Sequence, residues 1–150
     1  MRYYVMEPLG NTKLPAVKNV EGAEVVLCPD LNRFCDIDYD LSCRLISERL
    51  KLLIEMYLLS YDFVPVIYMD VANKSQLVFF RFKPPIYNDC EASYRKDGVV
   101  SWISFSGINT PTIFTVQSPK GICSVVVSIA VAESALRRQI LGVDFNQISD

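Results

Sequence analysis

The 150-residue sequence contains no histidine. Without an imidazole the chain has no Ser-His-Asp or Cys-His catalytic pair, no histidine metal ligand and no histidine pH switch. It also has no apolar run long enough to span a bilayer, and residues 1–8 lack the apolar core of a signal peptide. We therefore expect a cytoplasmic protein without a membrane partner, a bound metal or a cofactor.

Cysteine is present, but in an odd number and without metal-binding spacing. Five cysteines occur, and no two of them form a C-x-x-C pair of the kind that zinc sites contain. This usage favours reduced thiols. Cys90 lies between Asp89 and Glu91, whose carboxylates oppose formation of a nucleophilic thiolate. A phosphate-binding loop is also absent, so we predict that the protein is not an enzyme.

Composition indicates an ordinary globular chain. Hydrophobic residues make up 51% and charged residues 21% of the sequence, and this length suits a single domain over residues 1–150. The formal net charge is −2, whereas free-standing nucleic-acid-binding proteins are usually basic. Part of the negative charge is concentrated in Asp36, Asp38 and Asp40.

Apolar periodicity predicts an α+β fold. A long helix is expected at about 41–59, capped by Asp40 or Ser42, because its polar side chains recur at steps of three and four. A short C-terminal helix is expected at about 134–141, with Gly142 in the left-handed position that ends it. Strands are expected at 1–6, 24–28, 63–69, 76–83, 99–105, 112–116 and 123–131, with a hairpin loop at 70–75. The prediction is one mainly antiparallel sheet packed by these two helices.

One strand suggests an alternative function. The segment Phe79-Phe-Arg-Phe-Lys83 interleaves aromatic and basic residues, as RNA-binding sheets do when they stack bases and contact phosphates. The same alternation also suits a core face and a solvent face. A small nucleic-acid-binding module therefore stands as the alternative, although the acidic composition makes nucleic acid an unlikely partner.

Three segments resemble a bacterial family of immunity proteins from polymorphic toxin systems. Asp40–Leu50 is similar to the family's "lSekL" helix, and Leu77–Phe82 followed by Asp89–Tyr94 keeps the family's order of a hydrophobic strand and a polar segment. Ser134–Phe145 resembles the closing "S-x-x-L … G-v-x-F" signature. The resemblance implies an α+β protein that binds and neutralises a cognate protein toxin without catalysis.

A protein–protein function directs attention to charged and aromatic surface residues. We expect Asp36, Asp38 and Asp40 to form a charged rim that steers a basic partner, with Tyr39 and Trp102 as aromatic contacts. Trp102 is also compatible with a core position, and it corresponds in the resemblance to a tryptophan noted in the family. Neither the oligomeric state nor the nature of the toxin follows from the sequence.

Overall fold

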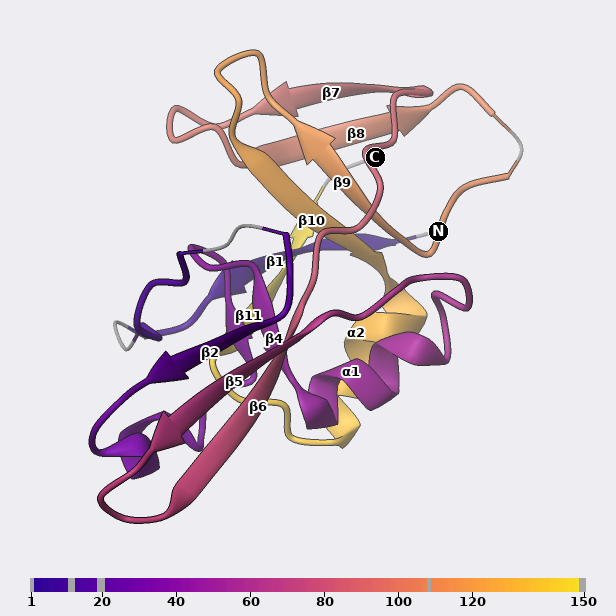
Figure 1. The fold of residues 1–150 in the computed structure, drawn as a ribbon. Coiled ribbons are helices and arrows are strands. Elements are labelled where there is room, and N and C mark those ends of the chain that lie inside the picture. Colours follow the sequence, from indigo (N-terminus) through magenta and orange to yellow (C-terminus); the bar gives the residue numbers. More distant parts are fainter. Residues whose placement is uncertain (1, 11–12, 19–20, 108, 149–150) are drawn as a thin grey trace.

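The structure is a computed structural model that describes residues 2–10, 13–18, 21–107 and 109–148 (Figure 1). Eleven strands and two α-helices are formed by these residues, together with one short 3-10 helix. In chain order the elements are β1 (Tyr3–Pro8), β2 (Glu24–Leu27), η1 (Leu31–Phe34), β3 (Tyr39–Asp40), β4 (Leu45–Ser47), α1 (Glu48–Glu55), β5 (Pro65–Asp70), β6 (Ser75–Arg81), β7 (Cys90–Tyr94), β8 (Val100–Phe105), β9 (Ile113–Gln117), β10 (Cys123–Ser128), α2 (Ile129–Arg137) and β11 (Val143–Ile148).

The strands divide between two sheets and a separate hairpin. The order is β11-β1-β10-β9 in the first sheet and β2-β5-β6-β4-β3 in the second, while β7 pairs with β8. The named strands pair antiparallel except β2 and β5, which are parallel. The α+β class is therefore confirmed, but the prediction of one sheet is wrong.

Prolines explain where the chain leaves one sheet for the other. β6 is followed by Pro84 and Pro85, and a proline has no backbone N–H with which to continue a ladder. The segment then runs beside β9, where the backbone N–H of Thr115 donates to the Pro85 carbonyl at 2.9 Å. Hydrophobic periodicity reveals the strands, but it does not reveal that this segment changes sheets.

The long helix predicted at 41–59 is also wrong. Residues 41–44 form a turn, residues 45–47 are β4, and α1 begins only at Glu48. Arg44 has a left-handed φ of 54°, which a continuous helix does not allow. The cap is Ser47, whose Oγ accepts the backbone N–H of Leu50 at 3.1 Å, and not Asp40 or Ser42.

The C-terminal helix is displaced towards the N-terminus relative to the predicted range of 134–141. β10 ends at Ser128 and α2 follows at once, because the apolar run at 129–132 suits a helix as well as a strand. α2 ends at Arg137, and Gln139 takes the left-handed conformation expected of Gly142, with φ of 53°. Gly142 is also left-handed, but it lies in the turn that leads into β11.

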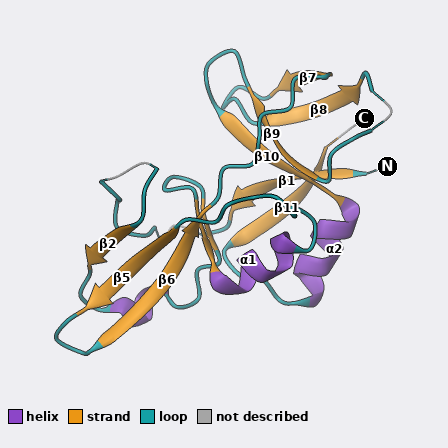
Figure 2. Cartoon of the chain, turned by 45° about the vertical axis from the view of Figure 1, so that its right-hand side comes forward, coloured by secondary structure: helices purple, strands orange, loops and turns teal. Residues whose placement is uncertain are grey.

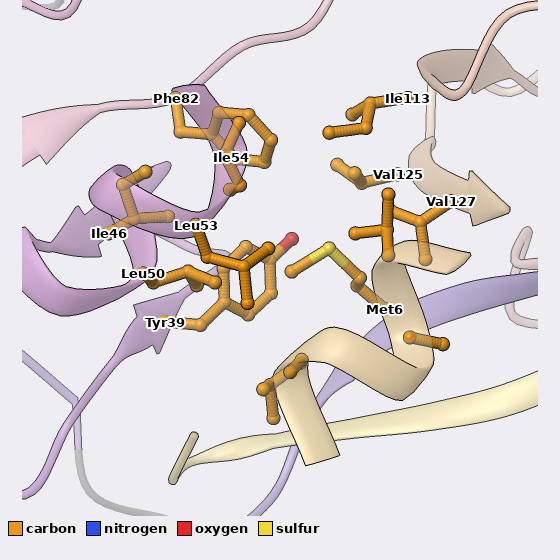
Figure 3. Packing of buried hydrophobic residues seen from close by; sticks show 14 residues of the cluster. Met6, Tyr39, Ile46, Leu50, Leu53, Ile54, Phe82, Ile113, Val125 and Val127 are labelled. Carbon is orange, nitrogen blue, oxygen red and sulfur yellow. The ribbon is translucent and has the colours of Figure 1, made fainter. Parts of the chain in front are cut away.

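The main core lies between the two sheets and the two helices. Figure 3 shows side chains of α1 and of β3 and β4 meeting Met6 of β1 and the valines of β10. A second cluster packs η1 and residues around it against one face of β5 and β6. A third cluster joins the first sheet to the β7–β8 hairpin. Both sheets therefore have one well-packed face, which leaves the other face of β2, β5 and β6 to be considered.

Candidate binding surface

The three aspartates expected at the surface do not lie in similar environments. Asp36 is exposed, whereas Asp38 and Asp40 are buried, with only 4% and 5% of their surfaces accessible. A buried carboxylate requires internal hydrogen-bond partners, and both of these have them. The predicted rim is thus reduced to Asp36, because the other two carboxylates face the interior.

Asp38 joins three separate segments of the chain. Its carboxylate pairs with the Arg49 guanidinium at 2.5 Å and accepts the Ser47 hydroxyl at 2.5 Å. It also accepts the backbone N–H of Leu141 at 2.5 Å, from a residue more than one hundred positions away. Charge-assisted hydrogen bonds of this kind are the strong ones. Asp38 therefore holds the start of α1 and the turn before β11 together.

The two aromatic candidates lie in different parts of the molecule. Tyr39 is buried, and burial raises the pKa of its hydroxyl far above the ordinary value. Trp102 is half-buried on β8, where it pairs with Ser93 of β7. Figure 1 shows the β7–β8 hairpin at the opposite end of the molecule from η1, after which Asp36 follows. The structure therefore does not bring these residues together into one site.

The Phe79–Lys83 strand does not form a stacking platform. Phe79, Phe82 and Arg81 are buried, whereas base stacking requires exposed aromatic faces. Phe80 is half-buried beneath the Lys51 ammonium, which lies 4.8 Å from the centre of its ring. Lys83 is the one exposed residue of this segment. Both sides of this segment are therefore mostly buried, and the expected division into a core face and a solvent face is not seen.

Three of the five thiols, those of Cys28, Cys43 and Cys90, lie where burial disfavours the reactive thiolate. Burial, followed by the charge of Asp89, raises the pKa of Cys90 above its ordinary value. Burial likewise raises the pKa of Cys28 and Cys43. Within the described part of the chain, no group of three or more cysteine, aspartate or glutamate side chains is placed to hold a metal ion.

An uncovered apolar surface lies on the second sheet. Strand pairing aligns Val25 with Ile67 and Val78, and aligns Leu27 with Met69. Residues paired across strands point to the same side of a sheet, so these five side chains share one face. The opposite face carries Val66, Tyr68 and Phe79, which are buried. We call the face formed by Val25, Leu27, Ile67, Met69 and Val78 the outer face.

The outer face is not part of the hydrophobic core. Its five residues belong to none of the three core clusters formed by the described residues. Leu27 is 72% exposed and Val25 57%, while the other three are half-buried. Figure 2 shows β2, β5 and β6 extending away from both helices. A contiguous row of apolar side chains on a sheet surface is typical of an interaction site.

Asp36 lies near one side of this face. β4 pairs only with residues 79–81 of β6, so the earlier part of β6 has no strand partner on that side. A shallow groove of about 630 Å³ follows this free edge, and its lining includes Asp36, Arg49 and Val78. The groove therefore connects the exposed carboxylate predicted from the sequence to the apolar outer face.

Sequence reasoning missed the outer face. The signal was available, because residues 65–69 are apolar at successive positions and not only at alternate ones. Such a strand requires cover on both faces, and a chain with two short helices has little with which to provide it. The exposure of Val25 and Leu27 depends on β2 being an edge strand, which no local pattern specifies.

Comparisons with known proteins identify no relative. A scan against family models finds no match, and searches of curated proteins and of solved structures find none either. Neither helix among the described residues has the length and apolar character needed to cross a bilayer.

Proposed function

We propose that this chain neutralises a cognate bacterial protein toxin by binding to it, without catalysis, and that the outer face docks on the toxin. The observation that carries the proposal is the row of apolar side chains that lies outside the core clusters of the described chain and leaves Val25 and Leu27 exposed. The proposal combines this surface with the resemblance to immunity proteins seen in three segments of the sequence.

The outer face has the composition expected of the centre of an interface. Interface centres are depleted in charge and rich in apolar side chains, and they are surrounded by a polar rim. The five outer-face residues carry no charge, and the Lys51 ammonium lies at the Phe80 and Phe63 rings near one end of the same sheet. Asp36, in the groove beside β6, supplies a rim carboxylate.

The outer face is too small to form a complete interface with the toxin. A stable interface buries roughly 800 Å² on each partner, which is more than five apolar side chains provide. The outer face therefore supplies the central contacts, where a few residues carry most of the binding energy. Rim charges such as Asp36 act mainly on the rate of association.

Co-expression tests the proposed function. The toxin domain encoded beside this chain in its genome is expressed with and without the chain, and cell growth is measured. Wild-type protein is expected to restore growth, because the complex blocks the toxin. The proposal is wrong if the toxin stays active in the presence of folded protein.

Two leucine substitutions test the docking face. Leu27→Glu places a charge in the outer face and is expected to weaken toxin binding at least tenfold, about 1.4 kcal/mol. Leu59→Glu is the matched control, since Leu59 is 87% exposed and lies beyond α1, away from β2. Equal affinities of the two variants, measured by calorimetry, would show that the toxin docks elsewhere.

A further inference from the structure

A cavity on another part of the surface is lined by several cations. Its volume is about 590 Å³, and it lies between the β3–β4 turn, the end of β6 and the segment before β5. The cationic lining residues are Arg44, Arg81 and Lys83, and the acidic ones are Glu21 and Asp62. This volume is typical of small-molecule sites.

Two of these cations have no carboxylate partner. Arg81 is engaged, since its Nε and guanidinium donate to the Gly22 carbonyl at 3.4 and 3.3 Å. Arg44 and Lys83 form no ion pair with any described residue. The Arg44 guanidinium contacts the Cys123 sulfur at 3.6 Å, which is a weak acceptor. A half-buried guanidinium without an anion retains most of its capacity to bind one.

The backbone of Arg44 adopts a conformation that is unfavourable for a residue with a side chain. Its φ of 54° is left-handed, a conformation that glycine adopts without strain and a residue with a Cβ does not. Arg44 is one of the residues that line the cavity.

A buried hydroxyl without a partner lies beyond Arg44. A smaller cavity of about 20 Å³ shares Arg44, Phe82 and Lys83 with the larger one and extends to Tyr39. The Tyr39 hydroxyl is buried and forms no hydrogen bond with the described residues. Figure 3 shows the Tyr39 hydroxyl pointing from β3 towards Met6 and the β10 valines. Buried hydroxyls normally have a partner.

We infer that the 590 Å³ cavity binds a small molecule carrying an oxyanion group, a phosphate or a carboxylate, held by Arg44 and Lys83. The planar guanidinium of Arg44 offers paired N–H donors that match either oxyanion, and Lys83 adds a second positive charge. Tyr61, which is half-buried, provides an aromatic wall for the rest of the molecule. This site lies apart from the outer face and does not depend on toxin binding.

Thermal unfolding with simple anions tests the inference. Sodium phosphate, pyrophosphate and citrate are each compared with sodium chloride of the same ionic strength. Phosphate and pyrophosphate represent the phosphate source, and citrate represents the carboxylate source. At four times the Kd of a bound anion, we expect the Tm to rise by roughly 2–4 °C.

Matched variants separate specific binding from general salt effects. Kosmotropic anions stabilise any folded protein by exclusion from its surface, so the measured quantity is the difference between wild type and Arg44→Gly. Glycine keeps the turn and removes the guanidinium. Lys74→Gly is the control, because Lys74 occupies the same left-handed position in an exposed turn. Arg44→Gly is expected to lose the anion-specific increase, and Lys74→Gly to keep it.

Several results would overturn the inference. An increase in Tm of equal size in wild type and Arg44→Gly would show that the cavity does not hold the anion. Equal losses in Arg44→Gly and Lys74→Gly would show that only net charge matters. A saturable NMR shift at the Arg44 and Lys83 amides, absent in Arg44→Gly, would support the inference, and a linear shift without saturation would contradict it.

Discussion

The chain makes the same tight turn twice, once beside the cation-lined cavity and once in solvent. Asp40-Leu-Ser-Cys-Arg44 connects β3 to β4, and Asp70-Val-Ala-Asn-Lys74 connects β5 to β6. In each turn the aspartate carboxylate accepts a backbone N–H from three residues ahead, Cys43 or Asn73, at 3.2 Å. Each turn ends on a cation in left-handed conformation, with φ of 54° and 51°.

The environments of the two turns differ. Asp40 also accepts the buried backbone N–H of Leu14 at 2.7 Å, which ties a distant loop to the turn. Asp70 is also buried, and it accepts backbone N–H groups of Asp30 and Leu31, but its largest interaction is within its own turn, with the Asn73 side chain at 2.8 Å. Residues 71–74 are all exposed, whereas Arg44 is half-buried. The comparison shows that five residues are enough to specify the conformation of the turn. Neighbouring segments of the fold determine its burial and its further hydrogen-bond partners.

The largest predicted difference between the turns concerns the two aspartates. Asp40→Ala is expected to lower the free energy of unfolding by about 3 kcal/mol, because it removes a charged acceptor and leaves the Leu14 N–H buried without one. Asp70 is buried as well and accepts backbone N–H bonds from Asp30 and Leu31, so Asp70→Ala is also expected to be destabilising. Its cost is expected to be smaller, because the Asn73 groups that it releases are exposed to water. Urea unfolding of both variants measures the difference.

The same experiment can contradict the comparison. Losses of equal size would mean that the bond to Leu14 adds nothing to what the turn itself provides. A matched variant, Ser42→Ala, isolates the local part, because the Ser42 hydroxyl donates to Asp40 at 2.7 Å without involving Leu14. Its expected effect is well below that of Asp40→Ala.

The two turns also show how much of the fold is predictable from sequence. The loop at 70–75 was predicted as a hairpin connection, and the register pairs Asp70 with Ser75. The equivalent turn at Asp40–Arg44 was predicted as the start of a helix, because apolar residues follow it at helical spacing. Aspartate serves equally as a helix cap and as a turn acceptor. Long-range pairing of β4 with β6 decides between them.

The candidate surfaces were harder to predict than the strands. Seven of the eleven strands of the described chain are predicted by their apolar, β-branched composition, and α2 in part. The prediction misses β3, β4, β7 and β11. The burial of Asp38 is not visible locally, because its partner Leu141 comes from the far end of the chain. Nor does any local pattern indicate that Val25 and Leu27 face solvent. These properties arise only when separate segments pack together.

Glycine substitutions at the two left-handed positions, Arg44 and Lys74, are expected to change the free energy of unfolding less than the aspartate substitutions do. Lys74→Gly is expected to raise the free energy of unfolding by about 0.5–1 kcal/mol, because glycine adopts φ above zero without strain. Arg44→Gly should gain less, since the half-buried Arg44 side chain also loses packing against its neighbours. Urea unfolding at neutral pH gives both values. A larger gain at Arg44 would mean that its side chain contributes nothing to the folded state.

The smallest effect expected is a change in acid sensitivity at Asp70. Hydrogen bonds, first from the Asn73 side chain, lower the pKa of Asp70 below its ordinary value of 3.8. The folded state therefore holds this proton less tightly than the unfolded state does. The resulting stability is fully present above pH 3.8 and is lost as pH falls through the lowered pKa.

Asp70→Asn should consequently flatten the fall of Tm below about pH 4, because the variant has no proton to take up there. Asn73→Ala is the matched control, since it removes the largest cause of the lowered pKa and keeps the carboxylate. It should shift the Asp70 titration, followed by NMR, back towards the ordinary value. Identical pH profiles of Tm in wild type and Asp70→Asn would show that the Asp70 carboxylate adds no charge-dependent stability to the fold.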